Sequence, residues 1–267
     1  MASTKAAKAE KSVNDQLHAQ DYLVYAFLQL GQDQDARAVV DDMVKTPIDN
    51  SFAFPAYYAR AASTARYVVE RGDWKGAANL AVEPCKFPHV MAIAHFARAL
   101  GAARSGNPQA ASADIARIAE MRDQLSEAKD AYWSQIVGIQ HQVVTAWQLY
   151  AEGKYDEALA MMSAASDAED KTEKHPVTPG PVAPARELYG TMLLDRGMAS
   201  EALAAFEASM AKEPNRFNGI AGAAQAAVTL GDSAKAKALN EKLVALASAA
   251  SDDRPALAEA RAFLAKN

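Results

Sequence analysis

A glycine followed five residues later by an alanine recurs six times along the chain. The pattern appears as LGQDQDA, RGDWKGA, SGNPQAA, EGKYDEA, RGMASEA and LGDSAKA, with the glycines at Gly31, Gly72, Gly106, Gly153, Gly197 and Gly231. Each glycine lies between two segments of helical character. It is expected to adopt the left-handed backbone conformation that turns the chain from one helix into the next. The alanine lets the second helix lie close to the first, so the pattern predicts a series of helix pairs.

The spacing of these glycines indicates a known class of repeat. They are separated by 41, 34, 47, 44 and 34 residues, and a period of about 34 residues is typical of tetratricopeptide (TPR) repeats. Residues 183–214 carry the expected glycines, alanine, phenylalanine and proline of one unit, at Gly190, Gly197, Ala202, Phe206 and Pro214. The chain resembles TPR proteins over about residues 12–247. The resemblance implies an all-α, right-handed solenoid of about six helix pairs with a concave inner face.

The prediction also covers the two ends of the chain. We expect one superhelical domain over residues 12–267, with a capping helix at 254–265 and a flexible segment at 1–11. The stretches AYWSQIVGIQ, AEDKTEKHPVTPGPVAPAREL and EPNRFNGIAGAAQAA are similar to a bacterial TPR subfamily of undefined activity with a KHPVTPG-type loop. Members of that subfamily are often longer and frequently carry an export signal. The resemblance therefore implies that the chain is a C-terminal portion of such a protein. It implies no particular enzymatic reaction.

Composition excludes several classes of function. The 28 basic residues are outnumbered by 33 acidic ones and form no block, which argues against nucleic acid as a partner. The single cysteine, Cys85, excludes an internal disulfide and a cysteine-based zinc site. The N-terminal residues lack the apolar run of a signal peptide, so the compartment stays open: cytoplasmic as the sequence stands, periplasmic if an export signal was removed. Residues 131–151 are uncharged but rich in glutamine, which argues against a membrane span.

Two helical faces carry candidate binding residues near the N-terminus. His18, Tyr22, Tyr25 and Gln29 follow one another at steps of four, three and four, so they share one face of a helix. First helices of TPR pairs line the concave side, and Tyr58 stands near the start of the next first helix. These residues are therefore candidates for contact with a ligand. The alternative is a packed aromatic stripe with satisfied hydroxyl groups.

A helix expected over 131–151 carries four further candidates. Trp133, Gln140 and Trp147 lie on one seam, and His141 belongs to a polar row without charges that also holds Ser134, Thr145 and Gln148. An exposed helix usually has charged residues on such a row. The row is therefore expected to face a sheltered cavity such as the inner groove. The alternative is that its amides bond neighbouring helices.

The proline-rich stretch 169–187 separates the fourth and fifth helix pairs. Pro176, Pro179 and Pro181 forbid helix and favour a stiff, extended course. It is either a structural connection or a lid over the concave mouth that presents Lys174 and His175. Arg186 adds a cation from the next helix. Such a cluster would suit a small carboxylate ligand or a carboxyl-terminal peptide.

The sequence contains no recognisable catalytic motif, and no histidine pair has the spacing of a helical metal site. No metal or cofactor is predicted. The leading hypothesis is a non-catalytic groove that binds a peptide or a partner protein. A small-molecule or metal-binding pocket closed by the 169–184 loop, with enzymatic activity left open, is the alternative. Self-association through the inner face is a third reading.

Overall fold

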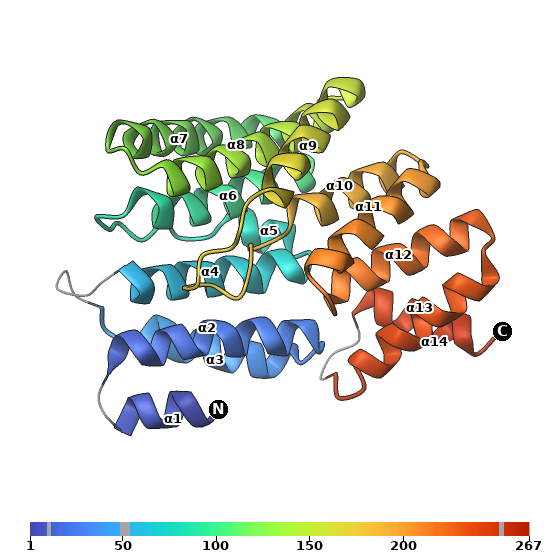
Figure 1. Ribbon diagram of the computed structural model, residues 1–267, viewed down its shortest axis with the longest axis horizontal. Helices are drawn as coiled ribbons and strands as arrows, with labels where there is room; N and C mark the ends of the chain where they lie inside the picture. Colours follow the sequence, from blue (N-terminus) through green and yellow to red (C-terminus); the bar gives the residue numbers. More distant parts are fainter. Residues whose placement is uncertain (10–11, 49–53, 251–253, 267) are drawn as a thin grey trace.

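The computed structural model describes residues 1–9, 12–48, 54–250 and 254–266, and all regular secondary structure in these ranges is α-helical (Figure 1). The all-α prediction is confirmed. The helices are α1 (Ala2–Ala9), α2 (Val13–Gln29), α3 (Asp33–Lys45), α4 (Phe54–Glu70), α5 (Trp74–Ala78), α6 (Pro88–Arg104), α7 (Pro108–Glu127), α8 (Ala131–Ala151), α9 (Tyr155–Asp170), α10 (Ala185–Asp195), α11 (Ala199–Lys212), α12 (Phe217–Leu230), α13 (Ser233–Leu246) and α14 (Pro255–Leu264).

The six repeated glycines turn the chain between paired helices, as the sequence predicts. Each has a positive φ, between 65° at Gly72 and 81° at Gly153. They separate α2 from α3, α4 from α5, α6 from α7, α8 from α9, α10 from α11 and α12 from α13. Side chains with a Cβ rarely adopt this conformation, so glycine is the residue that makes the turn with least strain. The described part of the chain therefore consists of six helix pairs flanked by α1 and α14.

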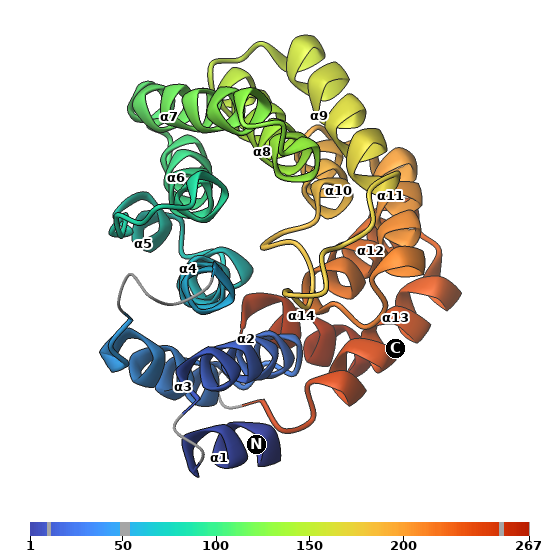
Figure 2. The ribbon, with the colours of Figure 1, turned by 60° about the vertical axis from the view of Figure 1, so that its left-hand side comes forward.

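Successive helices pack side by side and the row curves back on itself. The first helices of neighbouring pairs are in contact, α2 with α4, α4 with α6 and α6 with α8, and the row continues through α9 and α10 to α12 and α14. Figure 2 shows the helices arranged in a ring that brings the C-terminal helices next to α2. The connection between α9 and α10 runs on the inside of this ring. The curvature thus turns an inner face into an enclosed interior.

Small residues allow the helices to approach closely. A Cβ on Gly101 of α6 would lie 2.4 Å from the backbone nitrogen of Ala78 at the end of α5. The largest apolar cluster runs from α4 through α10 and includes Val177 and Val182 of the inner connection. That connection is therefore buried in the same core as the helices around it.

Some local expectations differ from the structure. Residues 2–9 form α1, which packs on α2, where a flexible segment was expected. Asn215 has φ 61°, and Arg216 is the N-cap of α12. A helix is present where the capping helix is expected, as α14. None of the described helices is long and apolar enough to cross a membrane.

Candidate functional site

The connection between α9 and α10, residues 171–184, is tied to helices on the opposite side of the ring. The Tyr22 hydroxyl on α2 donates to the carbonyl oxygens of Pro176 and Thr178, at 3.2 Å each. On α4, Arg66 Nη2 donates to the Gly180 carbonyl at 3.1 Å. Arg66 is itself fixed by a fully buried ion pair with Asp21. The loop therefore has a set course across the interior, as its prolines predict.

The base of this loop is clamped by charged side chains. Arg186 Nε donates to Asp170 at 2.6 Å, and its guanidinium also pairs with Asp167. The Glu169 carboxylate accepts the backbone N–H of Ala185, the first residue of α10, at 2.6 Å. Lys212 Nζ donates to three carbonyl oxygens at the end of α9 and the start of the loop, those of Glu169, Asp170 and Thr172. The two ends of the loop are thus held together.

An aromatic cluster anchors the tip of the loop. The His175 ring lies 5.2 Å from the ring of Trp133 and 5.6 Å from those of Phe54 and Tyr132, measured between centroids. Its Nδ1 accepts the backbone N–H of Val177 at 3.2 Å. Trp133 also stacks on His89, with centroids 4.3 Å apart and planes 8° from parallel. His175 is therefore packed into the wall of the interior by its apolar ring faces.

His89 is buried in this cluster without a hydrogen bond to either ring nitrogen. Burial lowers its pKa from 6.5 to about 4, because a charged imidazolium would lose its hydration there. The ring is accordingly neutral near pH 7 and behaves as an aromatic packing residue.

We expect His89→Phe to change the pH dependence of stability. Between pH 6.5 and about 4 the unfolded chain binds a proton at His89 that the folded protein does not accept, so protonation favours unfolding as the pH falls. Stability of the wild type relative to His89→Phe should fall by about 2 kcal/mol between pH 7 and pH 5. Urea unfolding of both proteins at the two pH values measures this difference.

The wild type must be compared with His89→Phe because Glu169 also makes the stability depend on pH, in the opposite direction. Burial raises its pKa from 4.5 to about 7, so its contribution to stability is present at low pH and is lost as the pH rises through 7. That contribution is common to both proteins and cancels. An equal wild-type–variant difference at both pH values would contradict the role assigned to His89.

A cavity of about 380 Å³, here called the loop cavity, lies between the loop, α8 and the junction of α11 with α12. Its wall on α8 is apolar and aromatic, and Tyr58 and Phe96 extend it. The other side is formed by the loop and by charged residues. The lining residues used below are Tyr58, Phe96, Tyr132, Trp133, Ile136, Gln140, Glu169, Asp170, Glu173, Lys174, Arg186, Lys212 and Glu213. A pocket of this size is in the range that holds a small molecule.

The structure brings five of the eleven predicted site residues together around the loop cavity: Tyr58, Trp133, Gln140, Lys174 and Arg186. Burial raises the pKa of the Tyr58 phenol to about 12, so it stays protonated. His175 and Tyr22 fix the loop itself. Most of these residues are far apart in the sequence, and the fold places them around one cavity.

The other four predicted residues lie elsewhere. His18 is in edge-to-face contact with Tyr22 on α2, and the Tyr25 ring lies near the guanidinium groups of Arg66 and Arg216. Trp147 stacks with Arg104 at 4.3 Å, outside the loop cavity. His141 is half-buried on the polar row of α8.

That polar row faces α7, which matches the alternative interpretation of its uncharged residues. Ser134 Oγ donates to the carbonyl of Arg122 at 3.3 Å, and Gln148 Nε2 donates to the carbonyl of Pro108 at 2.9 Å. Burial and the nearby Arg122 lower the pKa of His141. These side chains join α8 to α7, and the loop cavity lies on the other side of α8.

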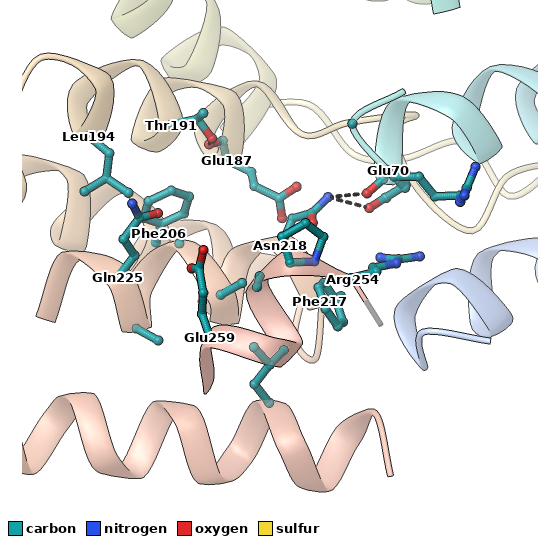
Figure 3. Close-up of a pocket in the computed structure, with 18 of the residues that line it drawn as sticks. Glu70, Glu187, Thr191, Leu194, Phe206, Phe217, Asn218, Gln225, Arg254 and Glu259 are labelled. Atoms are coloured by element: carbon teal, nitrogen blue, oxygen red, sulfur yellow. Dashed lines mark hydrogen bonds between the residues drawn. The ribbon is translucent and has the colours of Figure 1, made fainter. Parts of the chain in front are cut away.

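A second cleft, of about 610 Å³, lies where the two ends of the ring meet (Figure 3). Figure 3 shows Glu70 and Asn218 meeting at one end, while Leu194 and Phe206 line the other. Asn218 Nδ2 donates to the Glu70 carboxylate at 3.0 Å. The cleft is mainly apolar away from this polar end.

Buried charges close the ring behind this cleft. Arg216 donates to Glu187 at 2.9 Å and to Glu70 at 2.5 Å. Gln29 of α2 donates to Glu70 at 3.1 Å and accepts the backbone N–H of Phe217 at 2.8 Å. Arg254 pairs with Asp33. This closure network, defined as Gln29, Asp33, Glu70, Glu187, Arg216, Asn218 and Arg254, joins α2–α4 to α10–α14.

The sequence interpretation missed the closure network. Its charged members stand in stretches such as VVERGD and EPNRF, where a surface position is the default for Glu and Arg. No local signal distinguishes them from solvated charges. Their burial depends on the meeting of two distant parts of the chain.

Comparison with known protein families and curated proteins finds no match: no protein-family model matches the chain, and no curated protein is significantly similar to it.

Proposed function

We propose that this chain is a TPR-like, right-handed solenoid that binds a small molecule in the loop cavity without catalysing a reaction. The observation that carries the proposal is the course of the 171–184 loop. It runs across the interior, held by Tyr22 and Arg66, and leaves a partly enclosed cavity of about 380 Å³ next to α8. A peptide groove would need a channel that stays open along several helix pairs.

The TPR assignment is supported by the repeat geometry. Six helix pairs turn at glycines with positive φ, and the unit at 183–214 packs its glycine against its phenylalanine. A Cβ on Gly190 would lie 2.9 Å from the Phe206 ring. This is the close helix contact that a small residue at that position permits. Membership of the bacterial subfamily with the KHPVTPG-type loop is part of the same proposal.

Binding rather than catalysis is favoured by the residues around the cavity. The lining includes aromatic rings, aliphatic side chains, carboxylates and amines, but neither histidine nor cysteine. Its two amines, at Lys174 and Lys212, donate to backbone carbonyl oxygens, which favours a binding role over covalent catalysis by these amines.

Peptide or protein binding remains the second candidate, and one observation favours it. The loop is an extended, proline-rich segment bound through its backbone carbonyls by Tyr22 and Arg66, as a peptide in a groove would be. If the loop leaves the interior, the same donors become available to another extended chain.

Native mass spectrometry of the purified protein tests the first proposal. Ile136→Trp should fill the loop cavity and remove a co-purifying small molecule, because Ile136 lines the cavity and is half-buried. Val228→Trp is the matched control, since Val228 lines the second cleft and is 46% exposed. Loss of the bound mass from Val228→Trp alone would place the ligand in the second cleft. A bound peptide in the wild type would favour the second candidate.

A further inference from the structure

The polar groups left open in the loop cavity define what it can bind. We infer that its ligand carries an amine or another hydrogen-bond-donating cationic head on an apolar or aromatic body, an inference that rests on the function proposed above. The sequence had suggested the opposite polarity, a carboxylate held by Lys174, His175 and Arg186.

The cations around the cavity already have protein partners. Lys174 Nζ donates to the Thr178 carbonyl at 3.2 Å, and Arg186 is shared between Asp170 and Asp167. Lys212 donates to three carbonyl oxygens. Lys212 uses all three of its N–H groups in these bonds. Pulling Arg186 away from Asp170 and Asp167 would release the base of the loop, while Lys174 keeps N–H groups beyond its bond to Thr178. The cavity therefore has few donors to offer.

Its acceptors, in contrast, are open. Gln140 Oε1 is buried on α8 without a hydrogen-bond partner, which is costly unless a ligand or water donates to it. The Glu213 carboxylate lines the cavity and has no hydrogen-bond or ion-pair partner among the described residues. It lies against the loop, since a Cβ on Gly180 would be 3.2 Å from Glu213 Oε2. These two side chains supply acceptors to the cavity, Gln140 from the α8 wall and Glu213 from the junction of α11 with α12.

The surrounding charge and the aromatic wall fit the same ligand. Four carboxyl groups line the cavity, at Glu169, Asp170, Glu173 and Glu213, together with three cations. Glu169 and Asp170 are already bonded, to the Ala185 N–H and to Arg186, as the three cations are. Trp133, Tyr132, Tyr58 and Phe96 supply ring faces and edges. A cation is attracted to such ring faces, and an apolar body gains by leaving water. An anionic head would meet the Glu213 carboxylate, and only Lys174 and Arg186 keep N–H groups beyond their bonds to the protein.

Three probes with one ring and different heads test this inference: phenethylamine, 2-phenylethanol and phenylacetate. Binding is followed by the fluorescence of Trp133, with Trp133→Phe identifying its signal against those of Trp74 and Trp147. We expect phenethylamine to bind about tenfold or more tightly than phenylacetate, the equivalent of about 1.4 kcal/mol. Glu213→Gln should weaken phenethylamine about tenfold and leave 2-phenylethanol unchanged. Glu201→Gln is the matched control, because Glu201 is exposed on α11 and does not line the cavity.

The outcomes separate this inference from the function it rests on. Phenylacetate or 2-phenylethanol binding as tightly as phenethylamine, with Ile136→Trp abolishing it, would overturn the amine assignment and leave the loop cavity as a ligand site. Equal weakening by Glu213→Gln and Glu201→Gln would also overturn it. Absence of binding by all three probes would count against the loop cavity itself as a site for small molecules.

Discussion

Arg216→Met is expected to lower the free energy of unfolding by about 3–5 kcal/mol, because it leaves buried carboxylates without their cation. Arg216 is 1% exposed and bonds Glu187 and Glu70, which are themselves almost fully buried. Methionine replaces the aliphatic stem but not the charge. Urea unfolding followed by circular dichroism measures the loss.

The same substitution should also open the ring. Glu70 belongs to α4 and Arg216 precedes α12, so their bond joins the N-terminal and C-terminal helices. Small-angle scattering of the folded variant should show a larger radius of gyration. Arg117→Met is the control, since Arg117 and its partner Glu120 are each about half exposed on α7 and such pairs contribute about 0–1 kcal/mol. A loss at Arg216 no larger than the loss at Arg117 would contradict the structural role of the network.

Trp133→Ala is expected to cost about 3–5 kcal/mol, the usual range for removing a buried large aromatic side chain. Its ring contacts those of Phe54, Tyr58, His89, Tyr132 and His175. Trp133 also packs against His175 at the tip of the loop, so its removal should release the loop as well. Thermal unfolding and the rate of trypsin cleavage at Lys171 and Lys174 measure the two effects.

Trp133→Phe tests whether these losses follow from the smaller side chain alone or from the loss of an aromatic ring. Phenylalanine keeps a ring beside His89 and His175, so we expect a smaller loss of stability and slower cleavage than in Trp133→Ala. If Trp133→Ala unfolds like the wild type and its loop resists trypsin equally, the aromatic cluster does not anchor the loop.

The repeat pattern predicts the helix pairs well because it depends on local backbone chemistry. A glycine that must take a positive φ and an alanine that permits close packing act within a few residues of each other. The same reasoning explains the stiff course of residues 171–184, since proline restricts its own φ wherever the chain goes. At Asn215 the backbone turns before the helix, with φ 61°, and Arg216 is the N-cap of α12.

The candidate site is harder to predict from the local sequence. Tyr58, Trp133 and Gln140 could be selected from helical faces, and the structure places them in one wall. The charges of Lys174 and Arg186 were also noticed, but not their partners. Arg186 is occupied by Asp167 and Asp170, one helix away. Whether a cation is free or paired depends on the side chains that packing brings beside it.

The all-helical, paired organisation, the turns and the stiffness of the loop can therefore be read from the residues alone, because each depends on neighbours along the chain. The closure of the ring, the burial of Arg216 and Glu70, and the passage of the loop through the interior cannot. They depend on small rotations between successive helix pairs, which add up over the whole row until distant residues meet. The polarity of the loop cavity belongs to this second group, since it is set by the groups that packing brings beside Arg186 and Lys212.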